Sequence, residues 1–485
     1  MTPASGPPDG LARPFPETAE FDGGQLVAVG GVPVGELAER YGTPLWVVDH
    51  ATLLGRMRGY RDAFATAGRR RLGAPGTAVY AAKALCVRGV LELAADEGLG
   101  VDCASAGELA TAIAAGVDPA RILLHGNNKS LEELREAARL GVGRIVVDSL
   151  SELAHLDAVA AEAGRTLDVQ LRVTPGIDAH THEFVATGHD DTKFGLTLSR
   201  GFAHEAAARA VASPHVRLRG AHCHVGSDIL RTDAFRAAAE VMAGFLASVR
   251  DRHGVVLGEL NLGGGLGIPA QPADDPPPLA DYADEVAAAV AAACDARGLP
   301  HPQLLVEPGR SVAGPAGITV YRVGTIKELP GLRTYAAVDG GMSDNPRYAL
   351  YQAPHTFAPA GLPARGGAWQ PVTVVGMHCE TGDVLGEHAP LPADLAEGDL
   401  LAVAATGAYN HAMASNYNRV PRPAMVLVGG GRAVELVTRE TVDDLLAREP
   451  SLRGGLLGSP ATSPARGSPA DRRPTAPGTA VDSSS

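Results

Sequence analysis

The chain has 485 residues, of which 45% are apolar and 20% charged, and its formal net charge is −13. This balance is typical of a soluble globular protein with two or three domains. The acidic charge argues against a surface for nucleic acid or anionic membranes, because such surfaces need clustered lysine and arginine. We therefore expect a small-molecule ligand.

The cysteines and the first residues bear on the compartment. The five cysteines are widely scattered and include no C-x-x-C pair, which predicts neither a disulfide framework nor a metal site. The chain starts without a basic and then apolar signal sequence, and it has no apolar run of about 18 residues. These features predict a cytoplasmic protein.

Both ends of the chain are low in complexity. Residues 1–20 are rich in proline, glycine and alanine, and residues 454–485 are dominated by serine, proline, glycine, alanine and threonine. Such segments bury too little apolar surface to offset the entropy lost on ordering, so we expect two disordered tails. Residues 21–42 contain the β-like run Leu26–Val32, which we expect to pair with a sheet formed later in the chain.

Residues 43–311 alternate between short β-rich runs and helical stretches with an apolar period of 3.6 residues, such as Ser105–Ala115 and Ser130–Leu140. The alternation predicts an α/β fold closed as a (β/α)8 TIM-type barrel. An open doubly wound sheet is the alternative, but the Gly263–Gly267 run lacks the spacing of a dinucleotide fingerprint. The eight strands that we expect are Ala78–Ala82, Gly100–Ala104, Ile122–Leu124, Arg144–Val147, Asp168–Val173, Leu218–His222, Glu259–Leu262 and Gln303–Val306.

Residues 312–453 show β runs without long helices, which predicts a second, all-β domain. If Leu26–Val32 joins this sheet, the barrel is an insertion within the β domain. The runs are Ile318–Val323, Thr334–Val338, Pro371–Val375, Leu400–Ala405 and Ala424–Val428.

Reactive groups of a parallel barrel gather at the carboxyl ends of its strands. Lys83 follows the first strand, where burial is expected to lower the pKa of its amine and make it a nucleophile toward an aldehyde cofactor such as pyridoxal phosphate. The sixth strand ends in His222 and continues to His224, and their i, i+2 spacing favours one core and one pocket histidine over a shared metal.

The last two barrel strands end in further polar motifs. The Gly263–Gly265 run can bring backbone N–H groups close to a phosphate, although three glycines are often only a turn. Glu307 and Arg310 place a carboxylate and a guanidinium at the same rim, where the carboxylate can keep a pyridine nitrogen protonated. A plain salt bridge is the alternative. Cys379, between a histidine and a glutamate in the β domain, is a candidate proton donor or an inert core cysteine.

Taken together and in this order, the motifs resemble those of the barrel-type pyridoxal-phosphate decarboxylases, in particular the diaminopimelate decarboxylases. The resemblance spans about Gly42 to Val428. Its motifs are Tyr80–Ala84, His182–Phe184, Lys193–Gly195, His224–Ser227, Gly263–Gly265, Glu307–Arg310, Arg347–Tyr351, Cys379–Asp383 and Gly407–Tyr409.

The resemblance implies a role for each of these positions. Lys83 would hold pyridoxal phosphate covalently, His224 would stack on its ring, and Glu307 would pair with the ring nitrogen. The substrate's distal ammonium would meet Glu380, and Cys379 would return a proton after carbon dioxide has left. The remaining cofactor contacts would come from Ser227, Gly264, Gly265, Gly309, Arg310 and Tyr409, and the other substrate contacts from Arg310, Arg347, Tyr351 and Tyr409.

The implied reaction is decarboxylation of meso-2,6-diaminopimelate to L-lysine, a step of lysine biosynthesis, in a homodimer whose active site takes Cys379 and Glu380 from the neighbouring subunit. Thr381, Tyr348 and the Met342–Asn345 segment depart from the family's usual residues. They leave open a related decarboxylase of another acidic or basic amino acid, although Arg347 argues against simple diamines. An alanine racemase is disfavoured by the acidic Glu307, and a non-catalytic cofactor-binding protein by the presence of the β domain.

Overall fold

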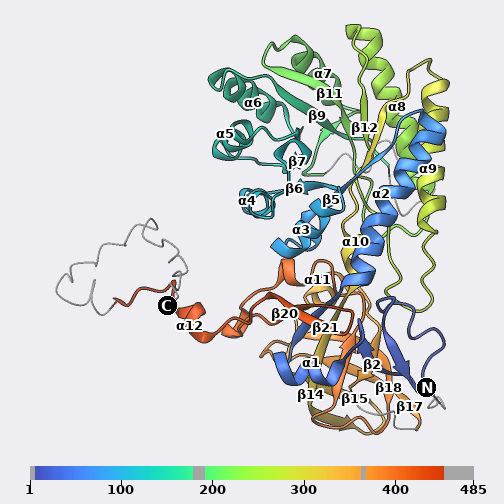
Figure 1. Cartoon of the computed structure of the whole chain (residues 1–485), viewed down its shortest axis with the longest axis vertical. Coiled ribbons are helices and arrows are strands. Elements are labelled where there is room, and N and C mark those ends of the chain that lie inside the picture. Colours follow the sequence, from blue (N-terminus) through green and yellow to red (C-terminus); the bar gives the residue numbers. More distant parts are fainter. Residues whose placement is uncertain (1–5, 178–191, 362–366, 453–485) are drawn as a thin grey trace, which may run out of the picture. The chain divides into compact units, whose positions relative to one another are not determined.

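The computed structural model describes residues 6–177, 192–361 and 367–452 (Figure 1). Eight parallel strands form a barrel, which closes because β9 pairs with β8 as well as with β11. The expected (β/α)8 barrel is therefore confirmed. A short strand, β10 (Leu196–Thr197), is added beside β9. The barrel strands are β5 (Thr77–Ala81), β6 (Gly100–Cys103), β7 (Ile122–Leu124), β8 (Arg144–Val147), β9 (Leu167–Thr174), β11 (Val216–His222), β12 (Glu259–Asn261) and β13 (Gln303–Val306).

Helices surround the barrel strands (Figure 1). Their starts follow local capping chemistry: Ser105 accepts a hydrogen bond from the Glu108 N–H, and Ser130 and Glu133 form a capping box. Each helix turns an apolar face to the strands, as Leu134 and Ala137 do in α5. The helices are α2 (His50–Leu72), α3 (Arg88–Asp96), α4 (Ala106–Ala114), α5 (Leu131–Leu140), α6 (Leu150–Glu162), α7 (Phe202–Ala212), α8 (Asp233–His253), α9 (Leu279–Asp295) and the short α10 (Arg310–Ala313).

A second sheet of twelve strands, mostly antiparallel, forms within the described residues. The expected pairing of the N-terminal strand with this later sheet is confirmed, because Leu26 lies opposite Ala360. Two short helices, α1 (Val34–Tyr41) and α11 (Arg347–Tyr351), lie between its strands in the sequence. The strands are β1 (Glu20–Asp22), β2 (Gln25–Val29), β3 (Val32–Pro33), β4 (Leu45–Asp49), β14 (Gly317–Leu329), β15 (Arg333–Val338), β16 (Phe357–Ala360), β17 (Trp369–Val375), β18 (Val384–Pro392), β19 (Leu400–Val403), β20 (Ala424–Gly429) and β21 (Arg432–Val437).

Two segments differ from the sequence-based expectation. Strand β4, within the range assigned to the barrel, pairs with β14 and β20 of the second sheet. Residues 6–20, expected in a disordered tail, are described, and Leu11 and Phe15 are each only 5% exposed in an apolar cluster with Leu26. Burial of these two side chains offsets the ordering cost of a segment that is otherwise rich in proline and glycine.

Residues 441–452 are described as part of a separate unit, in which helix α12 (Val442–Leu446) starts at a capping box of Thr441 and Asp444. The expected C-terminal tail (454–485) and the His182–Phe184 motif lie outside the described residues. A search of the described helices finds none with the length and apolar character needed to span a membrane.

Candidate active site

Lys83 lies where the first barrel strand ends. Strand β5 stops at Ala81, and the next turn is a short 3-10 helix, Ala82–Ala84, that carries Lys83 at its centre. The side chain lines a cavity with an empty volume of about 510 Å³. The same cavity is lined by all the residues expected to contact the cofactor, namely Lys83, His224, Ser227, Gly264, Gly265, Glu307, Gly309, Arg310 and Tyr409.

The electrostatics of Lys83 correct one expectation. Burial lowers the pKa of Lys83, but Asp102, Tyr409 and Glu307 raise it by more, so the pKa lies above its ordinary value. The prediction of a lowered pKa for Lys83 was wrong because it took only burial into account. In this pocket the amine is held as a cation by neighbouring anions, and it must lose a proton before it can attack an aldehyde.

Both histidines of the sixth barrel strand line the cavity, in contrast to the expected core and pocket pair. Strand β11 ends at His222, so His224 lies after the strand. Side chains alternate between the two faces of a sheet only within a strand, so this rule does not place His224. Burial, with the cations of Lys83 and Arg172, lowers the pKa of His224 to about 3. Its ring is therefore neutral and suited to lie against an aromatic group.

Glu307 follows strand β13 and is only 6% exposed. Its Oε1 lies 2.8 Å from His125 Nε2, and its Oε2 lies 3.1 Å from His222 Nε2. The ligating atoms of these three residues fall within 4.8 Å of one another. Hydrogen bonds donated by the two rings to the carboxylate account for this approach, and they leave Glu307 as an acceptor on the cavity wall.

The glycines expected to contact the cofactor stand where the backbone is crowded. A Cβ on Gly264 would lie 2.2 Å from the Glu307 carbonyl oxygen, and one on Gly265 would lie 2.4 Å from the Gly226 carbonyl oxygen. A side chain at either position would displace backbone that borders the cavity. An amine, a neutral aromatic ring, a carboxylate acceptor and a glycine-rich wall together fit pyridoxal phosphate.

Two arginines and a tyrosine stand together at the site. Arg310 Nη2 donates to Ser227 Oγ at 2.9 Å, and its guanidinium carbon lies 5.0 Å from the centre of the Tyr409 ring. The guanidinium carbon of Arg347 lies 5.8 Å from the same ring and 5.7 Å from that of Tyr351.

Arg347 is short of an anionic partner. Burial and the neighbouring Arg310 lower the pKa of Arg347 to about 10, so it remains a cation at neutral pH. No salt bridge to Arg347 is found among the described residues. Arg310 is different, since its Nε lies 3.9 Å from Asp228 Oδ1. Two adjacent guanidinium groups can bind an anion such as a carboxylate.

Cys379 and Glu380 do not line the cavity of their own chain, in the part of it that the structure describes. Cys379 is an exposed free thiol, and its backbone N–H donates to Asn418 Oδ1 at 3.1 Å. Glu380 Oε1 accepts a hydrogen bond from the Gly382 N–H at 3.2 Å. Tyr351 is 60% exposed and is also absent from the cavity lining.

Sequence reasoning missed three titratable residues of the cavity: Asp102, His125 and Arg172. Asp102 lies in β6, His125 directly follows β7, and Arg172 lies near the end of β9. All three strands were expected from the sequence, so a search for polar side chains at their carboxyl ends would have found these residues.

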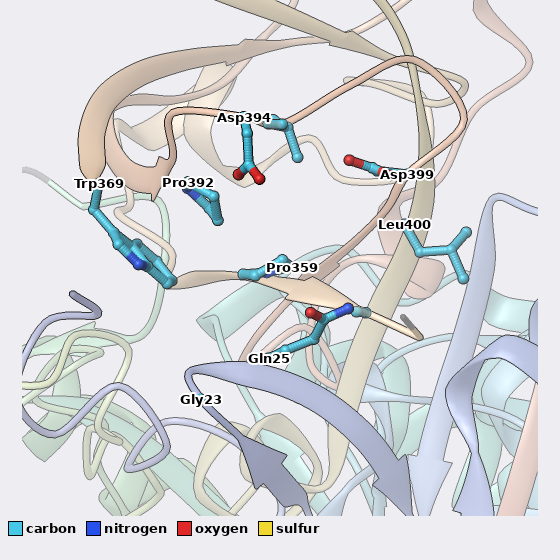
Figure 2. Close-up of a pocket in the computed structure, with 10 residues that line it drawn as sticks. Gly23, Gln25, Pro359, Trp369, Pro392, Asp394, Asp399 and Leu400 are labelled. Carbon is cyan, nitrogen blue, oxygen red and sulfur yellow. The ribbon is translucent and has the colours of Figure 1, made fainter. Parts of the chain in front are cut away.

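A different cavity lies in the β domain, with an empty volume of about 390 Å³. Figure 2 shows Trp369, Pro359 and Pro392 around it, with Asp394 and Asp399 on its wall. It lacks the combination of amine, ring and carboxylate found at the barrel mouth.

Comparisons with known proteins agree with this geometry. Residues 56–314 match the family model described as the pyridoxal-binding domain of pyridoxal-dependent decarboxylases. The chain is 48% identical to diaminopimelate decarboxylase of Actinosynnema pretiosum subsp. auranticum over 436 residues, covering 90% of this chain and 95% of that protein. The Bacillus subtilis (strain 168) enzyme of the same name is 44% identical over 428 residues, with 88% and 96% covered.

A solved structure gives the same result. The crystal structure of diaminopimelate decarboxylase from M. jannaschii in co-complex with L-lysine is 32% identical, with a TM-score of 0.84 and coverage of 90% of this chain and 98% of that one. Sequence and structure agree over nearly the full length of these relatives. The chain therefore belongs to the diaminopimelate decarboxylase family of pyridoxal-dependent decarboxylases.

Proposed function

We propose that the protein uses pyridoxal phosphate to decarboxylate meso-2,6-diaminopimelate, giving L-lysine and carbon dioxide in lysine biosynthesis. The observation that carries the proposal is one cavity lined by Lys83, His224 and Glu307, with the cations of Arg310 and Arg347 beside it. The family relationship and the L-lysine bound by the M. jannaschii enzyme support the same substrate.

The cofactor, when bound, supplies an aldehyde that links to amines and an electron-poor ring that takes up the electrons of the broken bond. In the proposed mechanism Lys83 Nζ would hold the aldehyde, and the neutral ring of His224 would help to orient the cofactor. Glu307 would accept a hydrogen bond from the ring nitrogen and would keep that nitrogen protonated. The phosphate and the rest of the cofactor would be held by Ser227, Tyr409 and the backbone of Gly264, Gly265 and Gly309.

In this proposal the substrate is selected by Arg310 and Arg347, the two cations near Tyr409. Arg310 and Arg347 bind the distal carboxylate of the substrate, with Tyr351 beside them, and Glu380 binds the distal ammonium. A simple diamine would leave Arg347 without an anion, which is costly for a buried charge. The thiol of Cys379 would donate its proton to the carbon that loses carbon dioxide and would become a thiolate.

We also propose a homodimer with a shared active site. Cys379 and Glu380 lie outside the cavity lining of their own chain. In this proposal a neighbouring subunit supplies them. Met377 and Tyr351, both more than half exposed, are large apolar side chains that a subunit contact would cover. Mixing Lys83→Ala with Cys379→Ala subunits should restore activity, because one of the two sites in a mixed dimer is intact. A mixture that stays inactive, although the subunits exchange, would contradict sharing.

We further propose that the chain consists of a barrel inserted in a β domain, and that it works in the cytoplasm. All five cysteines are free thiols, as expected in a reducing compartment.

The test of the function is carbon dioxide release from meso-diaminopimelate by purified protein with pyridoxal phosphate, with L-lysine measured alongside. Release of both in equal amounts is expected. No release, or faster release from ornithine, would contradict the proposed substrate.

A further inference from the structure

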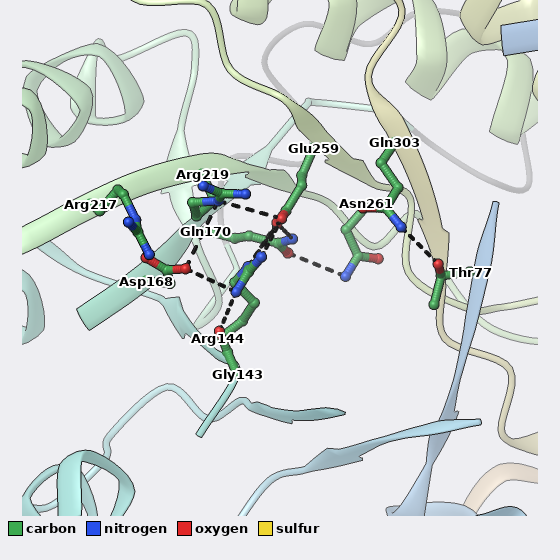
Figure 3. Close-up of polar contacts among 10 residues, drawn as sticks. All are labelled: Thr77, Gly143, Arg144, Asp168, Gln170, Arg217, Arg219, Glu259, Asn261 and Gln303. Carbon is green, nitrogen blue, oxygen red and sulfur yellow. Dashed lines mark hydrogen bonds and ion pairs between the residues drawn. The ribbon is translucent and has the colours of Figure 1, made fainter. Parts of the chain in front are cut away.

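Buried polar side chains cross the interior of the barrel, where branched aliphatic residues usually pack. We call Arg144, Glu259, Gln170, Asn261 and Glu307 the polar row. Gln170 and Asn261 are fully buried, and Glu259 and Glu307 are only 4% and 6% exposed. Figure 3 shows the first four of these residues, with dashed lines between neighbours. Burying such groups is unfavourable unless each one is hydrogen-bonded.

Consecutive members of the polar row are hydrogen-bonded to one another. Arg144 binds Glu259 with both Nε and Nη2, at 2.9 Å to Oε2 and 2.5 Å to Oε1. Gln170 Nε2 donates to Glu259 Oε2 at 2.9 Å, and Gln170 Oε1 accepts from Asn261 Nδ2 at 3.3 Å. Asn261 Nδ2 also donates to Glu307 Oε1 at 2.7 Å. The row therefore connects an ion pair at the start of the barrel strands to the carboxylate in the cavity.

The orientation of the Asn261 amide is determined by its contacts. Its Oδ1 accepts the backbone N–H of Gly263 at 2.9 Å, so its Nδ2 must face the other way. The two Nδ2 protons are then donated to Gln170 and Glu307. One side chain thus links the start of the glycine-rich segment to the Glu307 carboxylate.

The remaining contacts of Glu307 determine which of its oxygens can accept another hydrogen bond. Each carboxylate oxygen has about two lone-pair sites. Oε1 uses both, for His125 Nε2 and Asn261 Nδ2. Oε2 uses one, for His222 Nε2. Because Glu307 lines the cavity, Oε2 is the oxygen that remains for a donor entering it.

We propose that Asn261 is a positioning residue that fixes the Glu307 carboxylate. Asn261 is itself held in place by Gln170 and, through it, by the Arg144–Glu259 pair. As a result, only Oε2 of Glu307 is open to the ring nitrogen of the bound cofactor. The inference rests on the proposed function, since it concerns the same cofactor. The charge of Glu307 is consistent with it. Burial acts to raise the pKa of Glu307, but charge interactions with His125 and His222, together with their hydrogen bonds, more than offset burial, so the pKa lies well below its usual range.

The decisive variant is Asn261→Asp in the cofactor-bound enzyme. Aspartate keeps the shape and an oxygen for the Gly263 N–H, but it places an acceptor beside Glu307 Oε1 in place of a donor. We expect kcat to fall about 10- to 100-fold with a much smaller change in KM, the factor expected when a hydrogen bond to a charged group is lost. The pH titration of the visible absorbance of bound pyridoxal phosphate should also shift, because two adjacent carboxylates must share a proton.

A merely structural Asn261 would give a different result. If it only anchors Gly263, the Asn261→Asp enzyme should keep the kcat and the absorbance titration of the unaltered protein, and the inference would be wrong. Gln170→Leu is a second variant, which removes the bond that orients Asn261 and should shift the titration in the same way by a smaller amount. A folded Gln170→Leu enzyme with the original titration would contradict the role of the row beyond Asn261.

Gln303→Leu is the matched control. Gln303 Nε2 donates to Thr77 Oγ1 at 3.0 Å, and Figure 3 shows this pair separate from the polar row. Its loss should leave the titration unchanged. The titration needs cofactor binding but no decarboxylation. Unaltered protein that binds the cofactor yet releases no carbon dioxide would therefore contradict the proposed function, whereas an Asn261→Asp titration equal to that of unaltered protein would contradict only this inference.

Discussion

Replacing Gly264 by alanine should damage the site because the new methyl group would collide with the Glu307 carbonyl group. Its φ lies outside the left-handed region, so the substitution acts through the space that the new methyl group needs. That methyl would lie 2.2 Å from the Glu307 carbonyl oxygen, whereas ordinary contacts begin at 3.4 Å. The glycine segment or the backbone of Glu307 must therefore move by about 1.2 Å, the difference between the two distances. A displacement of this size costs about 100-fold in rate, and overpacking costs about 1–3 kcal/mol of stability.

The experiment compares Gly264→Ala with Gly258→Ala. Gly258 directly precedes β12, at the other end of that strand from Gly264, and its added methyl would meet nothing within 4 Å. Cofactor affinity by absorbance titration, carbon dioxide release and thermal unfolding should all be impaired in Gly264→Ala and unchanged in Gly258→Ala. Equal cofactor affinity and equal turnover in the two variants would refute the argument from backbone crowding.

Three more predictions concern reactive groups. Lys83→Ala should abolish the visible absorbance of the cofactor-bound protein, whereas Lys327→Ala should retain it; an unchanged Lys83→Ala spectrum would contradict the assignment. Uptake of pyridoxal phosphate by cofactor-free protein should accelerate with pH, by up to about tenfold per unit, because burial lowers the pKa of Lys83 less than Asp102 and Glu307 raise it. Stopped-flow rates that do not change from about pH 7 to 9 would show that the amine is already neutral. Cys379→Ala should lower kcat by about 100-fold or more while cofactor affinity hardly changes; equal losses of both would make Cys379 structural.

Local patterns in the sequence were enough to predict the barrel, and together with the family resemblance they indicated many of the residues that line its cavity. Three strands have the predicted bounds, namely Ile122–Leu124, Arg144–Val147 and Gln303–Val306. Their bounds could be predicted because the apolar patterns of strands and helices depend on residues that are close in the sequence. Lys83 and Glu307 could be assigned to one site because parallel strands bring their carboxyl ends to the same rim.

Tertiary structure decided the features that depend on residues far apart in the chain. His125 and Glu307 are 182 residues apart, and only barrel closure brings the imidazole within 2.8 Å of the carboxylate. The pKa of Lys83 lies above its ordinary value because the same closure brings carboxylates close to its amine. A prediction from the sequence can consider the burial of Lys83 but not these distant carboxylates.

The amino-acid sequence by itself thus determined which strands and helices form and which reactive side chains follow each strand. Closure of the barrel decided which of those side chains meet. The physical reason is range: secondary structure follows from contacts between neighbours, whereas hydrogen bonds and charge interactions at a site depend on distances of a few ångströms between residues that only the folded chain brings together.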